Sequence, residues 1–312
     1  MPTIADINSA RDRLRRYLHP TLMEIAPGLG KDTWLKLENT NLTHSFKIRG
    51  ALNAVLSLDD EQRARGIITV SSGNHAQGIA YAAYLTGATA RILMPSSTPK
   101  RKVDGVKRFG AIPILDYDNY DEAELVVHDV AREGGYTFVS PYNDPNVVAG
   151  AGTIGLEIVD SLPDVERVIV PTSGGGLISG VALAVKSLKP EAEVIGVNIL
   201  SAPAMYNIFE GTNLPHNWDT LAEALSGDIE KGSITIEMAK KYVDKIVLVN
   251  EEQVADAIRW MVDQQGWMVE GGATVGVAAL LNNVVPADDR KTAVVISGGN
   301  IDGKTFREVL GK

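Results

Sequence analysis

The sequence predicts an α/β fold built from two open, twisted sheets with helices on both faces. Short runs of β-branched residues alternate with helical stretches from about residue 33 onward, and each run is closed by Gly, Pro, Ser or Asn. This alternation is typical of parallel strands joined by crossover helices. The chain has 312 residues, 45% of them hydrophobic, so it is long and apolar enough to bury a core.

Nine runs qualify as strands, and this number suggests two sheets. They cover residues 34–37, 67–70, 90–94, 112–115, 137–139, 167–170, 194–198, 246–249 and 292–296. Helices are predicted over 74–86 and 119–133. Another helix begins after Asn250, a good N-cap residue with Gln253 at the third helical position. Its apolar face consists of Val254, Ala257, Ile258, Met261 and Val262.

Composition and charge exclude several classes of function. The chain holds 39 acidic and 30 basic residues, a net charge of -9, and has no basic run, so we expect no nucleic-acid partner. It has no cysteine, and its five histidines form no HxH or HxxxH pair, so we expect no metal site. No window reaches the roughly 18 apolar residues of a membrane span, and the N-terminus lacks the apolar core of a signal peptide. We therefore expect a cytoplasmic protein without membrane contact.

Residues 150–155 match the GxGxxG pattern of dinucleotide-binding loops. Such a loop should follow the first strand of its unit, whereas this one lies in mid-chain after Pro141 and Pro145. Leu156, Ile158 and Val159 continue the segment as a packed helix. We therefore interpret it as a packed helix whose small residues allow close approach of its neighbours.

Residues 172–176, TSGGG, are the strongest candidate for an anion site. They follow the apolar run 168–171 and lead into an apolar helix start at Leu177. Three successive glycines let backbone N–H groups turn inward together at a helix N-terminus, which suits a phosphate. No GK[ST] follows, so the loop is not that of a nucleoside-triphosphatase.

Two more loops follow predicted strands. Residues 71–75, SSGNH, open the helix over 74–86, and their N–H groups and hydroxyls suit a small carboxylate. Ser297 begins the loop SGGN after the last strand, at an edge where open α/β sheets bind ligands. A capping serine without a ligand is the alternative for the first of these loops.

Lys47 lies in an apolar stretch beside Phe46 and Ile48, where desolvation would lower its pKa and make it nucleophilic toward an aldehyde. Four segments in this order, SFKIRGA (45–51), SSGNHAQG (71–78), PTSGGGL (171–177) and SGGN (297–300), resemble the β-family enzymes of pyridoxal phosphate. This family is also called fold type II and is tryptophan-synthase-β-like. The resemblance is closest to its threonine/serine dehydratase and serine racemase branch and runs from about residue 5 to residue 310.

The resemblance implies pyridoxal 5′-phosphate as the cofactor and Lys47 as the lysine that bonds to it. The residues implied to hold the cofactor are Phe46 beside the ring, Asn74 at the ring hydroxyl, Ser297 at the pyridine nitrogen, Ala224 in a covering segment, and Ser173, Gly174, Gly175 and Gly176 at the phosphate. The residues implied to bind the substrate are Ser71, Ser72, Asn74 and His75, with His44 and Glu270 as further candidates. Ser72 matches the serine that acts as acid and base opposite the lysine in the racemase.

The activity implied is β-elimination of water from a hydroxy amino acid, L-threonine or L-serine, which gives a 2-oxo acid and ammonia. A neutral hydroxyl such as that of Ser297 at the pyridine nitrogen suits elimination better than transamination. Serine racemase and 3-hydroxyaspartate dehydratase share the motifs and stay open as alternatives. A protein that binds the cofactor without turnover is the alternative outside the enzymes.

Several positions depart from the family pattern. His44 stands where the family has the glycine of TGSFK, and Ala151 where many relatives have glutamine. Tyr142 precedes Asn143 where the racemase has an asparagine. These departures leave the identity of the hydroxy amino acid open. The divalent-ion positions of animal serine racemase are Asn198 and Ala204 here, so no such metal is expected.

We expect a large domain made of residues 1–58 and 146–312, with a smaller mobile α/β domain over 62–143 and the cofactor between the two. No Gly/Ser-rich or Pro-rich linker separates them, so the connections are short. Closure of residues 71–75 on a substrate carboxylate would exclude water. The family implies a homodimer. The chain leaves no room after residue 310 for a regulatory domain, so we expect no feedback control by an end product.

Overall fold

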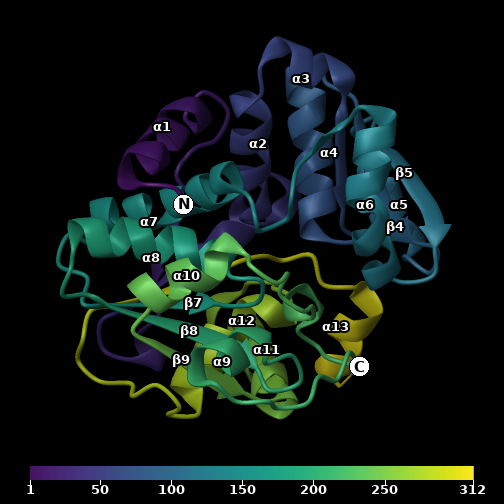
Figure 1. Cartoon of the computed structure of the whole chain (residues 1–312). Coiled ribbons are helices and arrows are strands. Elements are labelled where there is room, and N and C mark those ends of the chain that lie inside the picture. The colour runs from purple at the N-terminus through teal and green to yellow at the C-terminus, as the bar shows by residue number, and fades with distance from the viewer. Residues whose placement is uncertain (312) are drawn as a thin grey trace.

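The computed structural model describes residues 1–311 and contains two sheets (Figure 1). The six-stranded sheet has the order β1-β2-β10-β7-β8-β9 and the four-stranded sheet the order β5-β4-β3-β6. The strands are β1 (Met23–Ile25), β2 (Thr33–Leu37), β3 (Ile67–Val70), β4 (Ala90–Pro95), β5 (Ile112–Tyr117), β6 (Thr137–Phe138), β7 (Arg167–Pro171), β8 (Glu193–Ile199), β9 (Lys245–Val249) and β10 (Thr292–Ile296).

Helices lie between and around these strands. They are α1 (Ile4–Leu14), α2 (Lys47–Ser57), α3 (Asp60–Arg65), α4 (Asn74–Thr86), α5 (Lys100–Lys107), α6 (Tyr120–Gly134), α7 (Pro145–Ser161), α8 (Gly176–Leu188), α9 (Ala204–Glu210), α10 (Ile234–Tyr242), α11 (Glu251–Gln265), α12 (Gly271–Leu281) and α13 (Gly303–Val309). Short 3-10 turns cover Pro27–Leu29, Glu38–Thr40, Leu42–His44 and Glu223–Leu225. Within the described part of the chain, none of the helices combines the length and apolarity that a membrane span requires.

The predicted α/β class is confirmed, and all nine predicted strands are present. The three predicted helices are confirmed as α4, α6 and α11, and Asn250 and Gln253 form the predicted capping box of α11. The sequence did not predict β1, which precedes residue 33 and pairs antiparallel with β2 through Met23 and Lys36. Its three residues, MEI, are too short to show an alternating pattern. The domain limits and the mobility of the smaller unit stay predictions.

Alternation along the strands divides the core of the six-stranded sheet into two layers. Ala293 and Val295 of β10 face one cluster, which includes apolar residues of α7 and α8. Val294 and Ile296 face the other cluster, built with α11 and α12. Because successive side chains of a strand point to opposite faces, a sheet covered on both sides needs strands that are apolar throughout. The four-stranded sheet is covered in the same way, by α4 on one face and α6 on the other.

The GxGxxG segment forms the middle of α7, as predicted from its surroundings. A Cβ atom added at Gly150 would lie 2.5 Å from the carbonyl oxygen of Arg49 in α2. One added at Gly155 would lie 2.8 Å from the carbonyl oxygen of Val181 in α8. The glycines therefore let α2 and α8 pack directly on the backbone of α7, which explains the motif without a nucleotide.

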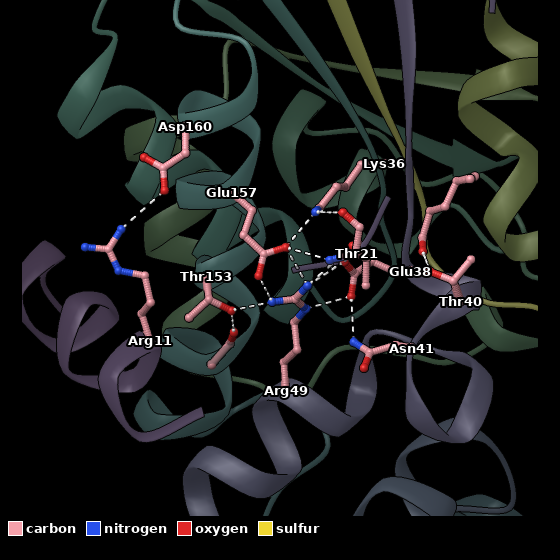
Figure 2. A network of polar contacts seen from close by, with 12 residues as sticks. Arg11, Thr21, Lys36, Glu38, Thr40, Asn41, Arg49, Thr153, Glu157 and Asp160 are labelled. Atoms are coloured by element: carbon pink, nitrogen blue, oxygen red, sulfur yellow. Dashed lines mark hydrogen bonds and ion pairs between the residues drawn. The ribbon is translucent and has the colours of Figure 1, made fainter. Parts of the chain in front are cut away.

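A buried ionic network joins α2, α7 and β2 (Figure 2). Arg49 of α2 donates to Glu38 over 2.7 and 2.9 Å and to Glu157 over 2.5 and 2.8 Å. Lys36 donates to Glu157 over 2.6 Å. The two cations and two carboxylates cancel in formal charge. This balance allows ionised side chains to lie in the interior beside the start of α2.

The charges of this network hold one another in the ionised state. Burial alone would raise the pKa of Glu38, but Arg49 and Lys36 lower it below its ordinary value. Burial works against Arg49 as well, yet Glu38 and Glu157 raise its pKa. The network was not foreseen from the sequence, although Arg49 lies in the segment SFKIRGA. It anchors the helix that begins with Lys47.

Candidate active site

The segments that contain Lys47 and Ser297 lie side by side through backbone hydrogen bonds. The N–H group of Phe46 donates to the carbonyl of Ser297 over 3.0 Å, and that of Gly299 donates to the carbonyl of His44 over 2.9 Å. Ser45 and Gly298 form an isolated antiparallel bridge between these two bonds. The end of β10 therefore fixes the backbone that leads into α2.

Lys47 is the first residue of α2, and its amine donates to the carbonyl of Pro141 over 2.8 Å. Burial lowers the pKa of Lys47 to about 8, and the carboxyl of Glu270 opposes part of this shift. At neutral pH a measurable fraction of the amine is therefore unprotonated. The predicted nucleophilic character of this lysine has its physical basis in that desolvation.

Asn74 lies at the centre of a chain of polar side chains. Its amide nitrogen donates to Glu270 over 2.7 Å, and its amide oxygen accepts from Asn300 over 2.7 Å. Asn300 also donates to the carbonyl of Thr43 over 2.9 Å. This chain joins the loops after β3 and β10 to the segment before Lys47 and to the start of α12. Asn300 was in a recognised motif, but its contact with Asn74 could not be read from the sequence.

Glu270 is only 8% exposed and lies against the loop after β10. A Cβ atom at Gly298 would lie 2.5 Å from a carboxylate oxygen of Glu270, so this glycine makes room for the carboxyl. Burial raises the pKa of Glu270 to about 7, even though the hydrogen bond from Asn74 lowers it. The group therefore changes its charge near neutral pH, close to Lys47.

His75 is 2% exposed and stands in the first turn of α4. Burial, and then the charge of Lys47, keep the pKa of His75 well below its ordinary value, so the imidazole is neutral. Neither ring nitrogen forms a well-aligned hydrogen bond within the described residues, although an interaction with the backbone of Val139 opposes the lowering of the pKa of His75. A buried imidazole without a well-aligned partner beside a helix N-terminus is a suitable donor for an anionic ligand.

Ser71 and Ser72 lie just before this helix. The hydroxyl of Ser71 accepts from the N–H of Gly73 over 3.2 Å, so it closes a turn rather than capping the helix, whose N-cap is Gly73 itself. Ser72 is partly exposed. A Cβ atom at Gly73 would meet no atom within 4 Å, so open space adjoins this loop. The arrangement leaves the loop free to receive a carboxylate.

The glycine loop has the form of a backbone cradle. Gly175 has a φ of +87°, which favours glycine, and it precedes the first turn of α8. A Cβ atom at Gly174 would lie 2.7 Å from the ring of Tyr142, and one at Gly175 would lie 2.5 Å from Met205. Ser173 donates to the carbonyl of Leu225 over 2.9 Å. Side chains are therefore excluded here, and N–H groups of the helix start are left for a ligand.

The remaining predicted residues surround this region. Ser297 is 4% exposed at the end of β10, and Ala224 is exposed in the 3-10 turn Glu223–Leu225. A Cβ atom at Gly272, two residues after Glu270, would lie 3.3 Å from that of Ala224. His44 is exposed and has a φ of +55°. The structure thus explains why glycine suits position 44, while the role of the imidazole stays open.

Asn198 is one of the two positions that match divalent-ion ligands in animal serine racemase, and its side chain makes internal hydrogen bonds. It donates to the carbonyl of Thr172 and accepts from the N–H of Tyr206 over 2.9 Å. Residues 1–311 contain no group of three or more His, Cys, Asp or Glu side chains arranged to hold a metal. The expected absence of a metal stays a prediction.

Comparison with known proteins decides the family. Residues 18–299 match the family model described as pyridoxal-phosphate dependent enzyme. The chain belongs to this family. It is 44% identical to an L-threonine ammonia-lyase of Thermotoga maritima over 100% of this chain and 79% of that protein. Among solved structures, it resembles maize serine racemase with a TM-score of 0.90 and 31% identity, over 99% of this chain and 97% of that one.

A threonine deaminase, isoform 2 from Solanum lycopersicum, also has a TM-score of 0.90, with 30% identity over 99% of this chain and 91% of that chain. The resemblance to fold type II enzymes of the threonine/serine dehydratase branch is therefore confirmed, as is the cofactor predicted from it. The residues present fit that cofactor. The cradle excludes side chains where a phosphate would lie, and the buried imidazole of His75 forms no well-aligned hydrogen bond within the described residues.

Two contacts of this pyridoxal-phosphate dependent enzyme were missed by sequence reasoning. Pro141 supplies the carbonyl that accepts from Lys47, and the Tyr142 ring supports the glycine loop. The departure of Tyr142 from the racemase pattern is its only signal in the sequence. The acceptor in Pro141 is a backbone carbonyl, which every residue has, so no sequence pattern could indicate its contact with Lys47.

Proposed function

We propose that this pyridoxal-phosphate dependent enzyme is a threonine/serine dehydratase, an ammonia-lyase that converts L-threonine or L-serine to a 2-oxo acid and ammonia. One observation carries the proposal. The Lys47 amine, with its pKa lowered to about 8, donates to the carbonyl of Pro141, which precedes the Tyr142 ring that packs on the glycine loop, and its charge acts on the buried imidazole of His75. The threonine ammonia-lyase and threonine deaminase named above support the choice of substrate.

The cofactor would be held at three places. Ser173 and the N–H groups of Gly174–Gly176 would bind its phosphate, Asn74 its ring hydroxyl and Ser297 its pyridine nitrogen. Phe46 precedes Lys47 and would pack near the ring, and Ala224 would cover it. The bound cofactor supplies an electron sink for the negative charge that develops at the α-carbon of the substrate.

The protein supplies the base and the carboxylate site. Lys47 takes the α-proton, since its lowered pKa leaves part of the amine neutral at pH 7 to 8. Ser71, Ser72 and the first turn of α4 hold the substrate carboxylate. His75 donates one N–H to it and, being neutral, does not compete with Lys47 for the proton.

The test is a substrate panel with the holoenzyme. L-threonine and L-serine should yield a 2-oxo acid and ammonia in equal amounts, and Lys47→Ala should abolish both products while the far-UV circular dichroism is retained. Lys186→Ala is the control, because Lys186 forms a partly exposed ion pair with Asp244. Unchanged 2-oxo acid formation by Lys47→Ala would refute the role of the lysine.

Serine racemase is the second candidate. The structural similarity to maize serine racemase and the open space beside Ser72 favour it. Chiral analysis of L-serine and D-serine after incubation separates the two activities, and Ser72→Ala should remove racemisation more than elimination. A 3-hydroxyaspartate in the same panel tests the remaining alternative. We also propose a homodimer in the cytoplasm, which light scattering and cell fractionation would test.

A further inference from the structure

The inference concerns Tyr142, whose side chain lies between the glycine loop and residues 225–235, a segment we call the strap. The strap runs from the end of the 3-10 turn Glu223–Leu225 to the first turn of α10. Apart from these ends it has no regular structure in the described chain. Its position is therefore determined by side-chain hydrogen bonds rather than by a helix or a sheet.

The ring of Tyr142 supports the glycine loop from one side. Tyr142 is 9% exposed. A Cβ atom at Gly174 would lie 2.7 Å from the Tyr142 ring, and a Cβ atom at Gly176 would lie 3.1 Å from the Cβ atom of Tyr142. Both glycines thus rest directly on the tyrosine. The loop cannot move toward the ring, and removal of the ring would leave this backbone without support.

The hydroxyl of Tyr142 and the amide of Asn143 hold the strap. The N–H of Glu230 donates to the Tyr142 hydroxyl over 2.8 Å. Asn143 donates to the Glu230 carboxylate over 2.7 Å and accepts from the N–H of Ile234 over 3.0 Å. Burial raises the pKa of Tyr142 to about 12, so the phenol stays protonated throughout the neutral range.

Both ends of the strap bond to the glycine loop as well. Ser173 donates to the carbonyl of Leu225 over 2.9 Å, and Thr235 donates to the carbonyl of Gly174 over 2.7 Å. The residue before Tyr142 is Pro141, whose carbonyl accepts from Lys47. Residues 141–143 therefore connect the reactive amine, the glycine loop and the strap in one continuous piece of chain.

We propose that Tyr142 is a positioning residue for the phosphate end of the cofactor, because it supports the glycine loop with its ring and fixes the strap with its hydroxyl. It does so next to the carbonyl that holds Lys47, so the spacing between amine and phosphate site is set by this residue. The inference rests on the proposed placement of the cofactor phosphate at residues 173–176. It assigns Tyr142 no contact with the reacting atoms.

The test compares two aldehydes that differ only in the phosphate. Apoprotein is titrated with pyridoxal 5′-phosphate and with pyridoxal, and the visible absorption of the lysine-bound aldehyde gives a Kd for each. Tyr142→Phe keeps the ring and loses one hydrogen bond, so its Kd for pyridoxal 5′-phosphate should rise about fivefold. Its Kd for pyridoxal should stay within twofold. Tyr136→Phe is the control, because Tyr136 stacks on Arg91 beside the four-stranded sheet.

Two further measurements keep the test independent of folding defects. Asn143→Ala removes both side-chain bonds to the strap and should show the same selective loss of phosphate-dependent binding. Hydrogen exchange of residues 226–234 in the apoprotein should be faster in Tyr142→Phe than in the wild type, and inorganic phosphate should slow exchange in the wild type more than in the variant.

The outcomes separate this inference from the proposed function. If the wild type binds neither aldehyde, the placement of the cofactor on Lys47 fails. If the wild type binds both and Tyr142→Phe equals it, or loses affinity for both equally, the positioning role of Tyr142 is refuted while the proposed function stands. A loss confined to pyridoxal 5′-phosphate, with faster exchange of the strap, supports the role.

Discussion

Arg49→Met tests whether the buried ionic network stabilises the fold around Lys47. The substitution keeps an unbranched side chain of similar bulk and removes the charge and all the donors. In the wild type, Arg49 gives two hydrogen bonds to Glu38, two to Glu157, one to Thr153 over 3.1 Å and one to Thr21 over 3.4 Å. Glu38 is 0% exposed, so it would lose its main counter-charge in the interior.

The expected cost follows from that uncompensated charge. Breaking a buried ion pair by removing one partner costs about 3–5 kcal/mol, and Lys36 remains to compensate Glu157. We therefore expect the free energy of unfolding to fall by about 4 kcal/mol at pH 7. Arg11→Met is the matched control, because Arg11 pairs with Asp160 at the surface over 3.4 Å. Its cost should stay below about 1 kcal/mol.

The stability difference between Arg49→Met and the wild type should depend on pH, and its direction follows from the pKa of Glu38. In the wild type, the folded-state pKa of Glu38 is depressed, so its contribution to stability is present above its unfolded pKa and is lost as the pH falls through the folded value. Without Arg49, burial acts on Glu38 with less opposition and its folded pKa rises. The carboxyl of the variant then takes a proton more readily, so the difference between variant and wild type should shrink from pH 7 to pH 5.

Urea unfolding followed by circular dichroism at both pH values measures this difference. Arg49→Met with Glu38→Gln should recover part of the loss at pH 7, because the buried carboxylate is gone. A cost below about 1 kcal/mol at pH 7, or a cost that grows toward pH 5, would contradict the account of the network. If the single variant does not fold at pH 7, the double variant still distinguishes an uncompensated charge from lost packing.

Three other predictions concern the site. The rate at which apoprotein Lys47 bonds to pyridoxal should rise with pH through a midpoint at about pH 8 and level off above it, and Glu270→Gln should move this profile to lower pH, because Glu270 raises the pKa of Lys47; a rate that still climbs steeply at pH 10 would contradict the lowered pKa. Ser297→Asp should change the absorption spectrum of the bound cofactor and the ratio of products, and an identical spectrum and ratio would remove Ser297 from the ring nitrogen. His44→Gly, which the φ of +55° accommodates, should change the relative kcat/KM for L-threonine, L-serine and 3-hydroxyaspartate; an unchanged profile would show that the imidazole does not contact the substrate.

The elements that could be predicted are those whose signal is local. The strands of both sheets are apolar runs closed by Gly, Pro, Ser or Asn, and all nine were found because burial on both faces leaves a continuous apolar segment. The loops after β3, β7 and β10 are predicted as ligand sites because each places small or hydroxyl residues where a strand ends, and this assignment stays a prediction. β1 was missed because three residues at the rim of a sheet carry no period.

The contacts that could not be predicted join residues far apart in the chain. Arg49 and Glu157 are separated by 108 positions, and Asn74 and Glu270 by 196. Such pairs have no spacing that marks them, since each partner taken alone is an ordinary polar residue. The same applies to the hydrogen bond between Tyr142 and Glu230, because its donor is a backbone N–H group and does not depend on the residue type.

Parallel strands of one sheet end at a common edge, which explains why loops of the same sheet lie close together. The candidate site, however, contains loops from both sheets. β7 and β10 belong to the six-stranded sheet, whereas the loop with Asn74 follows β3 of the four-stranded sheet. Helix α2 brings them together. Its glycine Gly50 packs on Val147 of α7, and a Cβ atom at Gly78 of α4 would lie 3.2 Å from the carbonyl oxygen of Lys47. Because α2 contacts helices of both sheets and begins with the reactive lysine, any displacement of the smaller unit acts directly on the start of this helix. Arg49 anchors α2 to Glu38 and Glu157, so it also fixes the start of this helix, and with it the Lys47 amine, relative to the six-stranded sheet.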